Sequence, residues 1–260
     1  DHTYADMDGR TTIITRGADM AMKKGMIVTN SAGNEGTNTW RYIVAPADGD
    51  SVLAVGAVDV NGNVASFSSY GPSADGRVKP DVSSVGMGTF LISTAGVTQQ
   101  GNGTSYSNPN LAGLVTCLWQ AFPDFRNTEI TDAVKKSSSR YTNPDDRMGY
   151  GIPNFRMAYQ ALAQERTRRQ ADKILGNATI KVYPNPMTEA PTILFRATAV
   201  GRLTLRVFNA IGQEIARQES DVATGQPNII RFELPDALPH GVYLLQYVNG
   251  GQKGTVRLVK

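Results

Sequence analysis

The chain has 260 residues, of which 40% are hydrophobic and 19% are charged. This composition is typical of a globular protein with one or two domains, and it excludes a disordered or fibrous chain. The formal net charge of +3 is too small to indicate a nucleic-acid partner, and no apolar run reaches the roughly 18 residues of a transmembrane segment.

The first third of the chain alternates helical and strand patterns. Thr11-Thr12 can cap a helix that runs to about Lys24, where Gly25 ends it. Met26–Thr29 and Ser51–Val58 are short apolar runs typical of buried strands. Helices that alternate with fully apolar strands predict an α/β unit, a parallel sheet with helices on both faces.

Apolar residues from Ser105 to Phe122 recur at helical spacing, and Pro123 ends the run. The run includes Leu114 on the face expected to be buried. The single cysteine, Cys117, lies in the same run, and we expect it to fill the core rather than to react. Two further helices are predicted, over 128–136 and from Asn154 through Leu162.

The character of the chain changes near residue 165. Residues 1–165 hold 13 Lys and Arg against 16 Asp and Glu, whereas residues 166–260 hold 13 against 7. We expect one domain over 1–163 and a partly helical polar linker over 164–177. From 178 to 260 the period is two, and a β-sandwich is predicted from seven short strands: 180–183, 192–197, 203–208, 214–218, 229–234, 242–248 and 255–259.

A first chemical signal is Gly103-Thr104-Ser105 at a loop-to-helix junction. Backbone N–H groups at a helix start can stabilise an oxyanion beside a serine nucleophile. The alternative is that Ser105 only caps the helix. A second signal, Ser31-Ala32-Gly33-Asn34-Glu35-Gly36, follows a predicted strand and could aim an asparagine amide into a cleft. The alternative there is an ordinary turn, which also favours Asn and Gly.

Taken together, the two motifs resemble those of the subtilisin-like serine peptidases, or subtilases. Phe67–Pro72, Asp75–Val82 and Gly149–Gly151 also look like segments of that family. The resemblance covers about residues 1–163 and implies part of a subtilisin-like fold. It implies Ser105 as the nucleophile, and the Asn34 amide with the Ser105 N–H as the oxyanion hole. Ser31, Ala32 and Gly33 would line one wall of the substrate pocket, and protein or peptide substrates would be hydrolysed.

This sequence departs from the family at several positions. Ser107 stands where an alanine is usual, and Tyr106 and Asn108 are also uncommon choices. More importantly, the family's Asp and His are not found. His2 precedes Asn34 by too few residues and lies in a different context, and His240 falls in a late turn.

Because the chain begins at Asp1-His2-Thr3, without Met or a signal peptide, we expect a fragment or a mature form. No cofactor is required by the resemblance, although bound Ca²⁺ is compatible with it. Asp6-Met7-Asp8 and Asp145-Asp146 lack the spacing of a full calcium loop, so solvated turns are expected there.

The β-rich end has a resemblance of its own. Val182–Pro186, Asn209–Gly212, Gly241–Leu245 and Leu258–Lys260 occur in the order typical of the C-terminal sorting domain of type IX secretion, an Ig-like β-sandwich. This implies the type IX machinery as a partner and a secreted or cell-surface protein of a Gram-negative bacterium. The whole sequence therefore predicts a secreted serine endopeptidase, present here without its Asp and His. The alternatives are a catalytically inactive subtilase-like binding protein and, for the β-rich end, an adhesion or carbohydrate-binding module.

Overall fold

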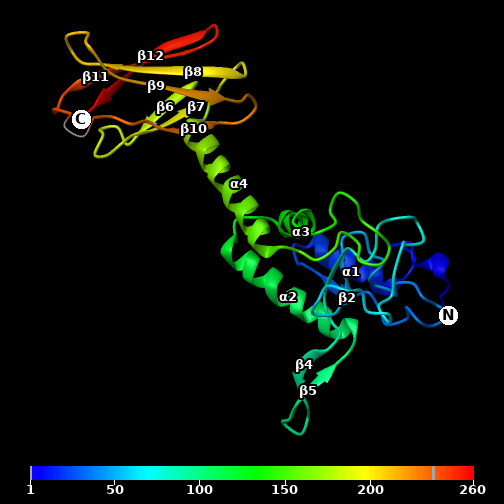
Figure 1. The fold of residues 1–260 in the computed structure, drawn as a ribbon. Helices are drawn as coiled ribbons and strands as arrows, with labels where there is room; N and C mark the ends of the chain where they lie inside the picture. Colours follow the sequence, from blue (N-terminus) through cyan, green and yellow to red (C-terminus); the bar gives the residue numbers. More distant parts are fainter. Residues whose placement is uncertain (1, 236–237) are drawn as a thin grey trace. The chain divides into compact units, whose positions relative to one another are not determined.

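The computed structural model describes residues 2–235 and 238–260, and the chain separates into two compact units, Asp1–Leu162 and Ala163–Lys260. The first unit is α/β and the second is dominated by antiparallel strands (Figure 1).

A parallel three-stranded sheet forms the centre of the first unit. Its strands are β1 (Thr29–Ser31), β2 (Leu53–Val58) and β3 (Val82–Val85), in the order β1-β2-β3. All six residues of β2 are buried, as expected for a central strand covered on both faces. Strand β1 leads directly into the Ser31–Gly36 motif, and the chain after β3 reaches Gly103 through residues 86–102.

The helices of this unit are the 3₁₀ turn η1 (Tyr4–Asp6) and the α-helices α1 (Ile13–Lys23), α2 (Thr104–Ala121) and α3 (Asn127–Lys136), and α3 packs on α2. Helix α2 contacts all three strands. The predicted start of α1 is confirmed, because the Thr12 side chain accepts a hydrogen bond from Thr15 N at 3.3 Å.

Three local expectations in this unit are wrong. The first strand pairs over Thr29–Ser31 rather than 26–29, because Met26 N is bonded to Ala21 O at the end of α1. An antiparallel hairpin, β4 (Thr89–Ile92) with β5 (Thr98–Gly101), was not predicted. Cys117 is exposed and Leu114 is 48% exposed, because only the Leu111, Val115 and Leu118 side of α2 is buried.

A buried ion cluster joins the sheet to α3. Lys79 Nζ lies 2.7 Å from Asp81 Oδ2 and also donates to Gly49 O and Val52 O. Lys135 Nζ, from α3, lies 3.0 Å from Asp81 Oδ1. Burial raises the pKa of Asp81, but the charges of Lys79 and Lys135 and their hydrogen bonds outweigh it, so that pKa lies below its usual range. The carboxylate is therefore ionised and fully committed inside the unit.

Helix α4 (Phe155–Leu175) replaces most of the expected linker. Its predicted start is confirmed by the Asn154 side chain, which accepts from Met157 N at 3.1 Å. The polar run that follows is helical because its charges pair at i,i+3 and i,i+4: Arg168 bonds both Glu165 and Asp172. Farther along, Ala171 and Leu175 are buried against Leu194 of the sandwich.

The second unit contains the seven predicted strands arranged in two antiparallel sheets (Figure 1). One sheet has the order β10-β7-β6 and the other β12-β11-β8-β9. Alternate residues of β11 are buried, which fits a sheet with one face in the core. The strands are β6 (Ile180–Tyr183), β7 (Thr192–Phe195), β8 (Gly201–Phe208), β9 (Glu214–Val222), β10 (Asn228–Arg231), β11 (Val242–Asn249) and β12 (Gln252–Val259).

Replacing Asp81 by asparagine should destabilise the first unit by about 3–5 kcal/mol, because Lys79 would remain buried without its counter-charge. Urea unfolding at pH 7 measures this loss. Asp132→Asn, an exposed change on the same helix as Lys135, is the control and should stay within about 0.5 kcal/mol. A loss for Asp81→Asn no larger than that of the control would contradict the account.

The ion pairs of Arg168 with Glu165 and Asp172 along α4 should make the stability of the second unit depend on pH. Hydrogen bonds from Arg168 lower the pKa of Glu165 from 4.5 to about 2. Its contribution is therefore complete above pH 4.5 and is lost as pH falls through about 2. Glu165→Gln should lower the free energy of unfolding of the second unit by a few tenths to about 1 kcal/mol at pH 7, since these side chains are largely exposed. Denaturation across this range should show the difference shrinking with acid, and a constant difference would refute the role of the charge.

Candidate active site

Asn34 lies on a tight turn that directly follows β1. Gly33, just before it, has φ +115°, and a Cβ there would lie 2.7 Å from Ser69 Oγ. Ser69 holds the turn from both sides: its N–H donates to Gly33 O at 2.9 Å and its hydroxyl accepts from Glu35 N at 2.9 Å. A glycine is thus required at position 33, and the turn fixes the direction of the next side chain.

Ser105 lies in the first turn of α2. The chain enters this helix through Gly103, whose N–H donates to Gly86 O at 2.8 Å. Pro109 inside the helix cannot donate to the Ser105 carbonyl. Ser105 itself is exposed, and its hydroxyl makes no hydrogen bond to another described residue.

The structure brings Asn34 and the serine turn together. Asn34 Oδ1 accepts from Thr104 N at 2.9 Å and from Thr104 Oγ1 at 3.0 Å. Because both bonds reach the oxygen, the amide nitrogen of Asn34 keeps its two donor hydrogens, and it lies beside Gly103. Two motifs 70 residues apart in the chain therefore meet at one point, with a free amide donor next to a helix N-terminus.

Thr104 and Ser69 were not singled out as site residues from the sequence. Thr104 holds the Asn34 amide through two bonds, and Ser69 holds its turn. The available signal was their position inside Gly103–Ser105 and Phe67–Pro72, but a residue pattern alone does not show which atom each contacts.

The Ser107 departure fits the local structure. The side chain is completely buried, and its hydroxyl donates to Thr104 O at 3.0 Å. A buried hydroxyl that makes a hydrogen bond carries no large penalty. The helix start therefore accepts serine at this position.

Ser31, Ala32 and Gly33 lie beside the same junction. Ser31 Oγ donates to Thr104 O at 3.1 Å, and Ala32 is buried. Val44 faces Gly33, since its Cγ2 would lie 3.1 Å from a Cβ at that position, and Val44 N donates to Ala32 O. Ser31 and Gly33 are thus partly exposed small residues beside Val44, and Ala32 supports them from inside.

Within the first unit, no described contact joins His2 to Ser105. His2 is exposed and lies 3.8 Å from Asp6. His240 is exposed in the second unit. Among residues 2–235 and 238–260, no group of three or more His, Cys, Asp and Glu side chains could hold a metal. Asp8 and Asp145 instead accept backbone N–H groups of their own turns.

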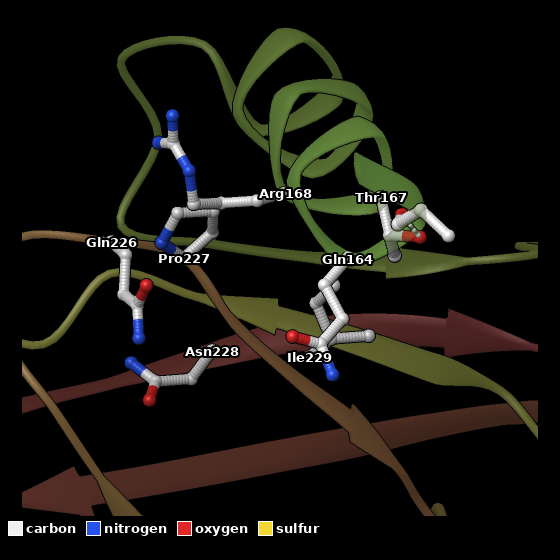
Figure 2. Close-up of a pocket in the computed structure, with 8 residues that line it drawn as sticks. Gln164, Thr167, Arg168, Gln226, Pro227, Asn228 and Ile229 are labelled. Carbon is white, nitrogen blue, oxygen red and sulfur yellow. Dashed lines mark hydrogen bonds between the residues drawn. The ribbon is translucent and has the colours of Figure 1, made fainter. Parts of the chain in front are cut away.

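A cavity of about 500 Å³ opens in the second unit between α4 and the segment that leads into β10 (Figure 2). Its polar groups are largely occupied within the protein. The Arg168 guanidinium is paired with Glu165 and Asp172, and the Asn228 side chain bonds the Ala223 backbone. Figure 2 shows the lining: Gln164, Thr167, Arg168, Gln226, Pro227, Asn228 and Ile229. This cavity has no chemistry in common with the serine site.

In the part of the chain that the structure describes, no helix combines the length and the apolar character that crossing a bilayer requires.

The structure thus places an exposed serine on a helix start, beside an asparagine amide held against the same turn. Residues 5–151 match the subtilase family, and the chain belongs to that family. It is 32% identical to subtilisin DY of Bacillus licheniformis over 142 residues, which are 54% of this chain and 48% of that protein. It is also 32% identical over 149 residues to a thermophilic serine proteinase of Bacillus sp. (strain AK1), covering 56% and 34%.

The chain thus spans half or less of the length of these relatives. Among solved structures, MycP1 from the ESX-1 type VII secretion system is similar with a TM-score of 0.49 and 22% identity, over 58% of this chain and 46% of that one.

Residues 181–260 match the secretion system C-terminal sorting domain. The family and the sorting domain read from the sequence are therefore both confirmed. The expected fold class, a subtilisin-like α/β unit followed by a β-sandwich, is confirmed as well.

Gly33→Ala should disrupt the Asn34 turn. Its φ of +115° disfavours any side chain, and the added Cβ would press on Ser69 Oγ. We expect a loss of about 1–3 kcal/mol of stability in the first unit, measured by urea unfolding. Gly25→Ala is the control for positive φ alone, since a Cβ at Gly25 meets no atom within 4 Å. Equal losses for the two variants would show that contact with Ser69 is unimportant.

Proposed function

We propose that this chain is the serine-bearing part of a secreted subtilisin-type endopeptidase that hydrolyses peptide bonds in protein substrates. In this proposal Ser105 Oγ attacks the scissile carbonyl. The Asn34 Nδ2 amide and the Ser105 N–H stabilise the oxyanion of the tetrahedral intermediate. Ser31, Ala32 and Gly33 line one side of the pocket for a substrate side chain.

The contact between Asn34 Oδ1 and Thr104 carries the proposal. It orients the asparagine so that its donor side is available next to the serine turn, without rearrangement during the reaction. Fixed donors of this kind are the main source of transition-state stabilisation in acyl transfer.

The residues that would activate Ser105 belong, on this proposal, to a part of the protein outside these 260 residues. A serine hydroxyl is a weak nucleophile without an adjacent base. Among the described residues of the first unit, no base is hydrogen-bonded to the Ser105 hydroxyl, and the His2 imidazole lies 3.8 Å from Asp6. We infer that the 260-residue chain by itself has little or no peptidase activity.

The sorting domain supports the second half of the proposal, which concerns location. A C-terminal sorting domain over 181–260 implies recognition by a secretion machinery, which we propose to be the type IX system of a Gram-negative bacterium. The mature protein would then act outside the cell or on its surface.

The second candidate function is a catalytically inactive subtilase-like binding protein. The Ser105 hydroxyl is exposed and bonds no described residue, so no base in contact with it is seen, and this observation favours the binding protein. Reading the coding sequence upstream of residue 1 separates the two. An Asp and a His in the family's order support the peptidase, and their absence supports the binding protein.

In a form of the protein that carries such an Asp and His, Asn34→Ala should lower kcat by about 10²–10³ and change KM little, a magnitude known for subtilisin. Steady-state hydrolysis of a chromogenic peptide measures both constants. Asn38→Ala, which removes only a bond to Glu35, is the control and should change kcat less than about twofold. A rise in KM with unchanged kcat would rule out the oxyanion role.

A further inference from the structure

The last strand of the sorting domain forms an edge of its sheet. In the order β12-β11-β8-β9, β12 pairs only with β11 (Figure 1). Gly241 and Lys260 exchange two backbone hydrogen bonds, so the alternation of the ladder directs the backbone groups of residues 253, 255, 257 and 259 away from β11.

The C-terminal end of this edge is covered by the chain itself. There, Asn185 Nδ2 donates to Arg257 O at 3.0 Å, and Asn185 Oδ1 accepts from Val259 N at 2.9 Å. The Asn185 side chain thus replaces a neighbouring strand at this end. At the start of β12, the Gln252 side chain bonds Thr198 N and Arg196 O and leaves the outward backbone groups of the strand unused.

The centre of the edge is open. Among the described residues none bonds the backbone N–H and C=O of Lys253 and Thr255, or the N–H of Arg257. A row of unpaired strand groups beside a covered end is a template for a short added strand.

The side chains along the open centre carry one sign of charge. Lys253, Thr255 and Arg257 are exposed, and neither Lys253 nor Arg257 is paired with an acid in the described part of the chain. On the opposite edge strand, Glu214 and Glu219 of β9 lie close to the arginines of β8 and β9. Two of the three acids on that edge are therefore engaged and only Asp221 has no ion pair among the described residues, so a second copy could not offer two free acids four positions apart to Lys253 and Arg257.

We propose that Lys253–Arg257 is a strand-addition site for an extended acidic segment of a partner protein. An added strand would bond the free backbone groups. Its acidic residues four positions apart would face Lys253 and Arg257, and a residue between them would face Thr255. The site lies in the sorting domain, and it is independent of the serine site and of its proposed function.

The test uses the whole 260-residue chain and a fluorescent peptide, acetyl-Val-Glu-Val-Thr-Val-Glu-Val-amide, with a second peptide in which lysine replaces both glutamates. Fluorescence anisotropy should show at least about tenfold tighter binding of the acidic peptide. Backbone NMR shifts should locate that binding at residues 253–257. No binding at millimolar peptide, or equal binding of both peptides, would overturn the proposal.

Two variants separate the charges from the backbone groups. Lys253→Glu with Arg257→Glu should invert the preference between the peptides, whereas Lys173→Glu with Arg231→Glu, the matched control away from this edge, should leave it unchanged.

Thr255→Pro removes an outward N–H that the ladder does not use, and it should abolish binding of both peptides. Unchanged binding by Thr255→Pro would overturn strand addition. Light scattering that shows dimers broken by the Lys253→Glu and Arg257→Glu changes would assign the edge to a second copy instead.

Discussion

The buried contact between Asp81 and two lysines is the constraint on which the first unit depends. Asp81 stands at the start of β3, and its carboxylate also accepts from Ala54 N of β2 at 2.8 Å. Lys79 ties the same carboxylate to the loop before β2, and Lys135 ties it to α3. Lys79 and Asp81 are buried, and buried charges are costly unless they are paired, so this cluster, with the partly exposed Lys135, fixes one arrangement of strands and helix. From that frame, β1 leads to the Asn34 turn and the segment after β3 leads to Gly103.

The serine site is built on this frame by polar contacts between loops. Thr104 anchors the oxygen of the Asn34 amide, and Ser69 anchors the turn that carries it. These contacts leave the donors unused and point them at the start of α2, which is a preorganised arrangement in the sense that catalysis requires. On our proposal, these donors form the oxyanion side of a subtilase-type site. Our proposal places the Asp and His that would activate Ser105 in a part of the protein outside these 260 residues.

The sequence predicted those parts of the fold that local patterns determine. Threonine and asparagine caps located the starts of α1 and α4, and alternation located all seven strands of the sandwich. The prediction failed where the packing around an element decides. Met26 is bonded to Ala21 at the end of α1 and not to a strand, and the exposure of Cys117 depends on which side of α2 meets the sheet. The helical part of the expected linker extends to Leu175, because the charges after 164 pair with one another along the helix. The pairing of Asn34 with Thr104 had no local signal beyond the two motifs.

Labelling with a fluorophosphonate, followed by mass spectrometry of the digested protein, tests the central claim most directly. Such reagents react with a serine only when a base activates it beside an oxyanion hole. The account predicts stoichiometric labelling at Ser105 in a form of the protein that supplies the Asp and His, and no labelling of Ser105 in the 260-residue chain. Rapid labelling of Ser105 in the 260-residue chain, or labelling of a different serine in the longer form, would contradict it.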